Sequence, residues 1–201
     1  MKTPRSSRRH RSQQRQRRIL NAALECFASL GFDATTLEEI RSRSGASIGS
    51  IYHHFSSKED LAATLYVEGL RDYQEGLLAE LRWHTQCAAG IRAIVRYHLR
   101  WITKHRDWAR YLLDMRRAES VAAVEEQIHL MNREFFSEIR RWLEPHRKRG
   151  VLKRLPEDLY IAVVAGPSQE YARRWLAGRA KTDVTQAAKV LADAAWNALR
   201  T

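Results

Sequence analysis

Apolar side chains recur along most of the chain at the three- and four-residue spacing of a helix, and no segment alternates with period two for long. The first clear stripe predicts a helix over residues 12–30, and Gly31 suits the left-handed conformation that often ends a helix. The whole pattern predicts an all-α protein of about nine helices. The first stripe consists of Ile19, Ala23, Cys26, Phe27 and Leu30.

Two short helices follow. Thr36 and Glu39 have the spacing of a capping box, which predicts the start of a second helix at Thr36. The sequence Ser-Gly-Ala at 44–46 predicts a tight turn, and Ser47 is a suitable cap for a third helix that ends near His54. Two short helices joined by such a turn form a helix-turn-helix, whose second helix fits the major groove of DNA.

The later stripes predict a larger helical bundle. We expect Gly69 and Gly76 to weaken the fourth helix by roughly 1 kcal/mol each, and Gly166-Pro167 to kink or break the eighth. The predicted helices cover about 58–83, 88–105, 107–117, 120–148, 156–178 and 183–200. The predicted parts are a basic disordered arm at 1–11, a DNA-binding domain at 12–57 with its motif at about 36–55, and an effector-binding and dimerisation domain at 58–201.

Charge is concentrated at the N-terminus. The formal net charge is +12, and residues 1–18 carry eight basic side chains and no acid. Such an arm joined to a helix-turn-helix is suited to neutralising phosphates, although a solvated tail is the simpler interpretation when DNA is absent. The basic residues are Lys2, Arg5, Arg8, Arg9, Arg11, Arg15, Arg17 and Arg18.

The composition also excludes several classes of protein. No apolar run approaches the 18 residues of a membrane span, and no apolar segment follows the basic N-terminus as in a secretory signal. Cys26 and Cys87 have neither metal-ligand spacing nor a disulfide framework, which favours a reducing cytoplasm. We find no phosphate-binding glycine loop and no nucleophile elbow, and we expect no catalytic residue, metal or cofactor.

The third helix has the side chains of a DNA reader. Ile51 and Phe55 lie one turn apart and are expected to face inward, while small residues would let the backbone approach base edges. A hairpin buried in a core would instead require large apolar residues at 47–50. A metal at His53-His54 would lack a third ligand. The outward face is Ser47, Ile48, Gly49, Ser50, His53 and His54, with Thr36, Tyr52, His54 and Lys58 near the path of the phosphates.

The stretch 17–66, above all GASIGSIYHHFSSKEDL, resembles the DNA-binding domain of the TetR family of bacterial transcriptional regulators. AGPSQEYARRWLAG is similar to the eighth helix of many members. Arg41 stands where a small Ala is common, so packing between the second and third helices is expected to differ locally. The resemblance implies that Thr36, Ser47, Tyr52, His54 and Lys58 hold phosphates and that Ile48, Gly49, Ser50 and His53 face bases.

The resemblance further implies a homodimer that releases a double-stranded operator when a small-molecule effector binds the bundle. Independently, the last two helices carry apolar stripes with many small residues, which suits a four-helix dimer interface, although both helices could simply pack within one chain. The predicted interface is Leu159, Val163, Tyr171, Trp175, Val184, Ala188, Leu191 and Ala195. The predicted effector pocket is Trp101, Trp108, Tyr111, His129, Arg133 and Phe136, all of which could equally be ordinary core.

The sequence thus predicts an effector-responsive, sequence-specific repressor that binds a palindromic operator. A non-specific nucleic-acid-binding protein would use the same charge and is the alternative. A helical enzyme would need clustered carboxylate or histidine ligands at inward positions.

Overall fold

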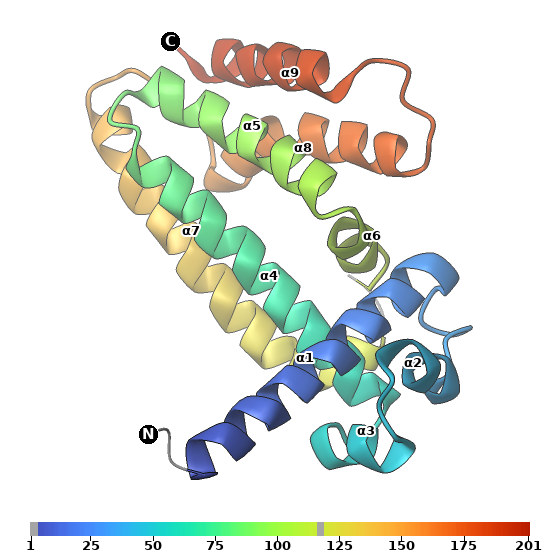
Figure 1. The fold of residues 1–201 in the computed structure, drawn as a ribbon. Coiled ribbons are helices and arrows are strands. Elements are labelled where there is room, and N and C mark those ends of the chain that lie inside the picture. The colour runs from blue at the N-terminus through green and yellow to red at the C-terminus, as the bar shows by residue number, and fades with distance from the viewer. Residues whose placement is uncertain (1–3, 116–118) are drawn as a thin grey trace. The chain divides into compact units, whose positions relative to one another are not determined.

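The computed structural model describes residues 4–115 and 119–201, and in these ranges it contains nine α-helices and one short 3-10 helix (Figure 1). The all-α prediction is confirmed. No helix in the described ranges is both long and apolar enough to cross a membrane. The helices are α1 (Pro4–Leu30), α2 (Leu37–Ser44), α3 (Ile48–His54), α4 (Lys58–Arg82), α5 (Cys87–Lys104), α6 (Arg106–Met115), the 3-10 helix (Glu119–Val124), α7 (Glu125–Lys148), α8 (Glu157–Leu176) and α9 (Val184–Leu199).

The chain forms two compact units. The first comprises Met1–Leu70 with Asp107–Glu126, and the second comprises Arg71–Arg106 with Gln127–Thr201. The division between them falls inside α4. The assignment of separate functions to 12–57 and 58–201 stays a prediction.

In the first unit, α1 begins at Pro4 and not near Ser12, so residues 4–11, predicted as a disordered arm, are helical. The physical reason is that Pro4 occupies a first-turn position, where proline is tolerated, and neither Gly nor Pro interrupts the helix before Gly31. Gly31 ends the helix with a φ of 86°, as its position predicted. Of the predicted stripe, Leu30 is 44% exposed and the other four residues are buried. The buried residues of α1 are Ile19, Leu20, Ala22, Ala23, Leu24, Cys26 and Phe27.

In the second unit, α5, α8 and α9 contact one another and enclose a hydrophobic core (Figure 1). The guanidinium of Arg92 on α5 lies 2.6 Å from a carboxylate oxygen of Asp193 on α9. The amide of Lys153 donates to the carbonyl of Leu199, which ties the loop after α7 to the end of α9. The buried members of the core are Cys87, Ile91, Val95, Leu143, Leu152, Tyr160, Val164, Ala192, Ala195 and Leu199.

The two glycines of α4 lie where other elements approach closely. A Cβ added at Gly69 would lie 2.4 Å from the ring of Trp108, in the first unit. A Cβ added at Gly76 would lie 2.1 Å from the hydroxyl of Tyr97, in the second. The two glycines therefore lower the helical propensity of α4, but they allow the Trp108 ring and the Tyr97 hydroxyl to pack close to its backbone.

Of the kink or break predicted at Gly166-Pro167, the break is wrong, because α8 continues from Glu157 to Leu176 with Pro167 inside it. The kink stays a prediction. Proline removes one backbone hydrogen bond, and the packing of α8 on α5 and α9 stabilises the continuous helix. The long helix predicted from residue 120 also begins later, since residues 119–124 form the 3-10 helix.

Replacing Gly76 with Ala tests the close packing of α4. Alanine is the better helix former, but its Cβ would overlap the Tyr97 hydroxyl, which donates to the Tyr73 carbonyl. We expect unfolding to become easier by about 1–3 kcal/mol, a typical cost of overpacking, measured by urea unfolding followed by circular dichroism. The control is Gly49→Ala, whose Cβ would meet open space. Equal stability of the two variants would contradict this account.

Candidate nucleic-acid interface

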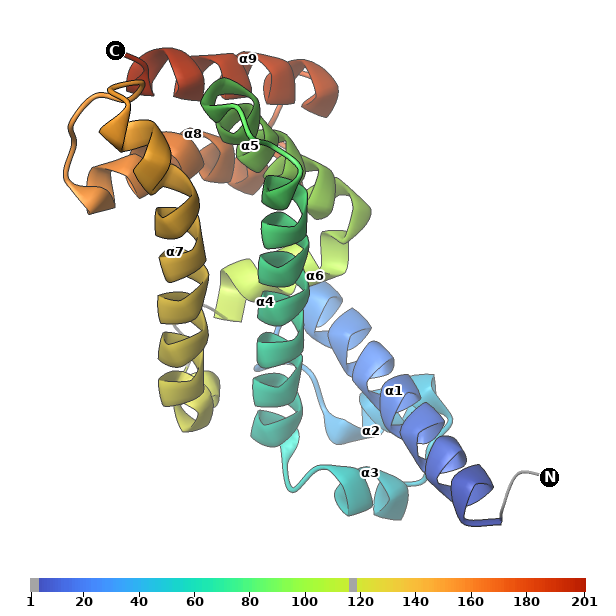
Figure 2. The same ribbon diagram turned by 90° about the vertical axis from the view of Figure 1, so that its left-hand side faces the viewer.

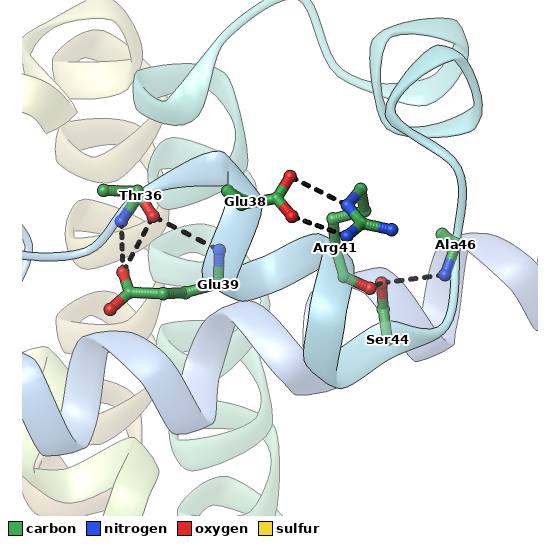
Figure 3. Close-up of polar contacts among 6 residues, drawn as sticks. All are labelled: Thr36, Glu38, Glu39, Arg41, Ser44 and Ala46. Atoms are coloured by element: carbon green, nitrogen blue, oxygen red, sulfur yellow. Dashed lines mark hydrogen bonds and ion pairs between the residues drawn. The ribbon is translucent and has the colours of Figure 1, made fainter.

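The capping box at the start of α2 is formed as predicted (Figure 3). The Thr36 hydroxyl accepts a hydrogen bond from the Glu39 amide at 3.2 Å, and the Thr36 amide donates to the Glu39 carboxylate at 2.7 Å. The hydrogen bonds from Thr36 hold the pKa of Glu39 below its ordinary value. These contacts fix the point at which the chain enters the helix-turn-helix.

The turn between α2 and α3 depends on Gly45, which has a φ of 63°. Its amide donates to the carbonyl of Arg41 at 3.1 Å. Figure 3 shows the Ser44 hydroxyl accepting from the Ala46 amide at 3.2 Å. Ser47 then caps α3 by accepting from the Ser50 amide. Because a side chain at Gly45 would be strained in this conformation, the turn is specified locally.

Helix α3 has one buried and one exposed side. Ile51 is 1% exposed and Phe55, which follows the helix, is 3% exposed. On the outer side, Ile48 is 43% and Tyr52 56% exposed. Ser47, Gly49 and His53 are exposed too, as is Thr36 at the start of α2. A rod of small, polar and aromatic side chains therefore faces solvent, as a DNA reader requires.

Two predicted contact residues are less accessible. Ser50 is half-buried, and its hydroxyl oxygen is buried without a hydrogen-bond partner in the described part of the chain. His54 is half-buried, and burial, followed by the charges of His53 and Arg15, lowers its pKa. The lowered pKa favours the neutral form of the His54 imidazole, and Ser50 offers no exposed hydroxyl to a base in this conformation.

Lys58 has a structural role that its predicted phosphate contact did not include. Its ammonium lies 2.9 Å from the carbonyls of Phe32 and Thr35 and 3.5 Å from that of Asp33. It also lies 4.4 Å from the centre of the Phe32 ring. Three carbonyls match the three donors of an ammonium, so Lys58 ties the α1–α2 loop to the start of α4.

Arg41, the departure from the family pattern, does not separate α2 from α3. It is exposed, and its guanidinium makes two hydrogen bonds to the Glu38 carboxylate on the same helix (Figure 3). The expected local change in packing between the two helices is therefore not caused by this side chain.

Sequence reasoning did not identify Arg15 as a neighbour of α3. The positive charge of Arg15 lowers the pKa of His54, although 39 positions separate the two residues in the sequence. The signal was available, because Arg15 precedes the buried Ile19 by one helical turn and so lies on the same side of α1.

The predicted effector residues fall in both compact units, and their grouping into one pocket stays a prediction. Trp108 and Tyr111 belong to the first unit, where Tyr111 is buried and donates to the Ala62 carbonyl. Trp101 is buried in the second unit and donates to Asp72. Phe136 is half-buried beside Phe135, and both His129 and Arg133 are exposed.

A different set of side chains lines an open groove of about 220 Å³ in the second unit. It combines apolar side chains with two arginines, and the Trp142 indole donates to the His84 carbonyl. No pattern along the chain predicts this groove, because its two walls are separated by more than fifty residues. The lining residues are Leu78, Leu81, Arg82, Glu138, Arg141 and Trp142.

A polar cluster lies inside the same unit. The Tyr73 hydroxyl is 2.9 Å from Nδ1 of His98, and the Tyr97 hydroxyl donates to the Tyr73 carbonyl. Nε2 of His98 is buried without a hydrogen-bond partner among the described residues. Burial lowers the pKa of His98 to about 4 and raises that of Tyr97 to about 12. His98 is therefore neutral at pH 7.

The predicted dimer residues differ in exposure. Leu159 is 44% exposed, whereas Val163, Val184, Ala188 and Leu191 are half-buried. Tyr171 donates to the Thr182 carbonyl, and Trp175 lies below the Arg106 guanidinium. The prediction that Ala195 lies in the dimer interface is wrong. Ala195 is 4% exposed and belongs to the core of its own chain, because that side of α9 packs inward.

Comparisons with known proteins agree with this geometry. Residues 19–65 match the family model described as bacterial regulatory proteins, tetR family. The HTH-type transcriptional repressor AcnR of Corynebacterium jeikeium is 33% identical over 69 residues, which are 32% of this chain and 36% of that protein. The chain thus matches little more than a third of that relative's length.

Solved structures share the fold over nearly the whole chain. A TetR family transcription regulator from Marinobacter aquaeolei has a TM-score of 0.81 at 18% identity and covers 96% of this chain and 98% of its own. FadR from Bacillus subtilis, in complex with stearoyl-CoA, has a TM-score of 0.77 at 18% identity and covers 90% and 97%.

The role of Lys58 can be tested through stability. We expect Lys58→Met to lower the free energy of unfolding by about 1–3 kcal/mol, because the part-buried Phe32 and Thr35 carbonyls lose their donor. Urea unfolding is the measurement, with Lys181→Met at an exposed lysine as the control. Unchanged stability of Lys58→Met would mean that the ammonium is not needed by the loop.

The half-buried His98, whose Nε2 atom is fully buried, makes the stability of the fold depend on pH. His98 binds a proton near pH 6.5 in the unfolded chain, but only near pH 4 in the folded chain. The contribution of neutral His98 is therefore complete above pH 6.5 and decreases as the pH falls, by up to about 3 kcal/mol. We expect His98→Phe to show a smaller loss of stability between pH 7 and pH 4.5 than the exposed His10→Phe. Parallel pH profiles would refute this.

Proposed function

We propose that this chain, which belongs to the tetR family of bacterial regulatory proteins, is a transcriptional repressor that binds a roughly palindromic operator as a homodimer. In this proposal it acts in the cytoplasm and catalyses no reaction. The observation that carries the proposal is the solvent-facing side of α3, where Ile48, Gly49, Tyr52 and His53 are exposed while Ile51 is buried.

Each exposed side chain suits a defined contact. Gly49 lets the backbone approach base edges, and Ile48 can contact a thymine methyl group. His53 can donate or accept at a base edge. Tyr52 and Thr36 carry exposed hydroxyls that can donate to phosphate oxygens. We keep Ser47 and His54 as phosphate contacts and assign Lys58 to holding the loop that carries Thr36.

A single seven-residue helix reads too few base pairs for a specific operator, so the proposal requires two copies. Exposed apolar side chains on α8 and α9 support self-association: Leu159, Ile161 and Val190 are 44%, 42% and 58% exposed. These residues replace Ala195 in the proposed interface. A two-fold dimer would present two α3 helices to a two-fold operator.

We also propose that a small-molecule effector controls DNA binding through the second unit. The groove between Leu78, Leu81 and Trp142 has Arg82 and Arg141 beside its apolar surface, which suits an amphipathic anion. The structural neighbour FadR binds stearoyl-CoA, a ligand of this chemical kind. Because α4 continues from the second unit into the first, an effector that prefers one position of α4 would shift the population of DNA-binding states.

A second candidate function is non-specific nucleic-acid binding. The net charge of +12 favours it, since phosphate neutralisation requires no base contacts. The two functions differ in selectivity: a specific repressor should bind its operator roughly 10³-fold or more tighter than an unrelated duplex.

The test begins with selection of bound sequences from a random duplex library. We expect an inverted repeat, bound by the wild type about 10³-fold tighter than a shuffled duplex when measured by fluorescence anisotropy. Tyr52→Ala should weaken operator binding at least tenfold without changing helical content, and Trp83→Ala, an 86% exposed aromatic of the second unit, should not. Equal binding to both duplexes would refute the proposed function.

A further inference from the structure

The N-terminal half of α1 is a basic helix that continues beyond α2 and α3 (Figures 1 and 2). Residues 9–18 are exposed except for the half-buried Gln16, and no acid occurs among them. We propose that residues 4–18 act as a rigid helical arm that lies along the DNA phosphates beside α3. This inference rests on the proposed function, since it assumes that α3 faces DNA.

The direction of the arm follows from the helical register. Positions 12 and 15 precede the buried Ile19 by seven and four residues, so they continue the side of α1 that faces the core of the first unit. Where that core ends, Arg15 takes the position of an apolar residue. The positive charge of Arg15 lowers the pKa of His54, at the end of α3. Arg15 therefore lies on the same side of the first unit as α3.

The charge of the arm is largely uncompensated. Arg17 lies 2.8 Å from the Glu68 carboxylate, which fastens the arm to α4. Within the described residues, no carboxylate forms an ion pair with Arg9, Arg11, Arg15 or Arg18. Arg11 and Arg15 are four residues apart, a spacing at which like charges repel on a helix. A polyanion would relieve that repulsion, whereas a neutral or basic partner would not.

The length of the arm matches a short stretch of DNA backbone. The ten helical residues 9–18 span roughly 15 Å. Phosphates follow one another about every 3.4 Å along the axis of each DNA strand. The arm can therefore contact several consecutive phosphates. A flexible tail could deliver the same charge, so the distinguishing feature of the proposal is the helix itself.

Two variants separate charge from helical geometry. Replacing Arg9, Arg11, Arg15 and Arg18 together with Gln removes the charge and keeps the helix. Gln13→Pro keeps every charge, but it removes an interior backbone donor and breaks the arm before the buried part of α1. Gln13→Ala is its control. A second control has the same charge loss in the second unit, at the exposed Lys104, Arg154, Arg174 and Arg179.

The measurement is the dependence of operator affinity on salt concentration, followed by fluorescence anisotropy. It is made on variants in which the rest of the chain, outside the arm, unfolds at the wild-type temperature. We expect the quadruple arginine variant to reduce the slope of log K against log salt by up to about 0.9 for each phosphate that the arm no longer neutralises. The charge-matched control should keep the wild-type slope. Gln13→Pro should lose at least tenfold in affinity at constant salt, while Gln13→Ala should not.

An unchanged slope in the quadruple variant would show that the arm does not contact phosphates. A reduced slope there combined with wild-type affinity of Gln13→Pro would show a flexible tail and overturn the helical arm. Failure of the proposed function is distinguishable, because it would appear as equal binding of the wild type to the selected and the shuffled duplex.

Discussion

Burial of Ile51 and Phe55 holds the rest of the candidate interface in place. A helix of seven residues is not stable alone in water. Ile51 in α3 and Phe55, the residue that follows it, are the large apolar side chains turned inward. With both buried against the first unit, the opposite side chains must face solvent. The exposed positions of Ile48, Tyr52 and His53 thus follow from the anchoring of their neighbours, and base reading would require that geometry.

The contacts before and after α3 determine where this helix begins and how it is oriented. The capping box at Thr36 fixes the start of α2, Gly45 turns the chain, and Ser47 starts α3. Lys58 completes the arrangement by holding three carbonyls of the α1–α2 loop. Gly45 and Lys58 position the reading helix without a proposed contact to DNA, whereas Thr36 and Ser47 both cap a helix and are proposed to contact phosphates.

The sequence predicted features that local chemistry determines. The capping box, the turn at Gly45 and the cap at Ser47 depend on residues within three or four positions of one another, and all are present. Features that depend on distant residues were predicted less well. The contacts of Lys58 span more than twenty residues, and the burial of Ala195 depends on how α9 packs. The groove lining and the partners of Gly69 and Gly76 likewise come from separate helices.

The central claim is that α3 reads base edges, and it is tested most directly by mapping which modified bases interfere with binding on the selected operator. The account requires interference in the major groove at two positions about 10 base pairs apart, or a multiple of that spacing, related by the two-fold axis of the site. Interference confined to phosphates, with every base position tolerant of modification, would contradict it.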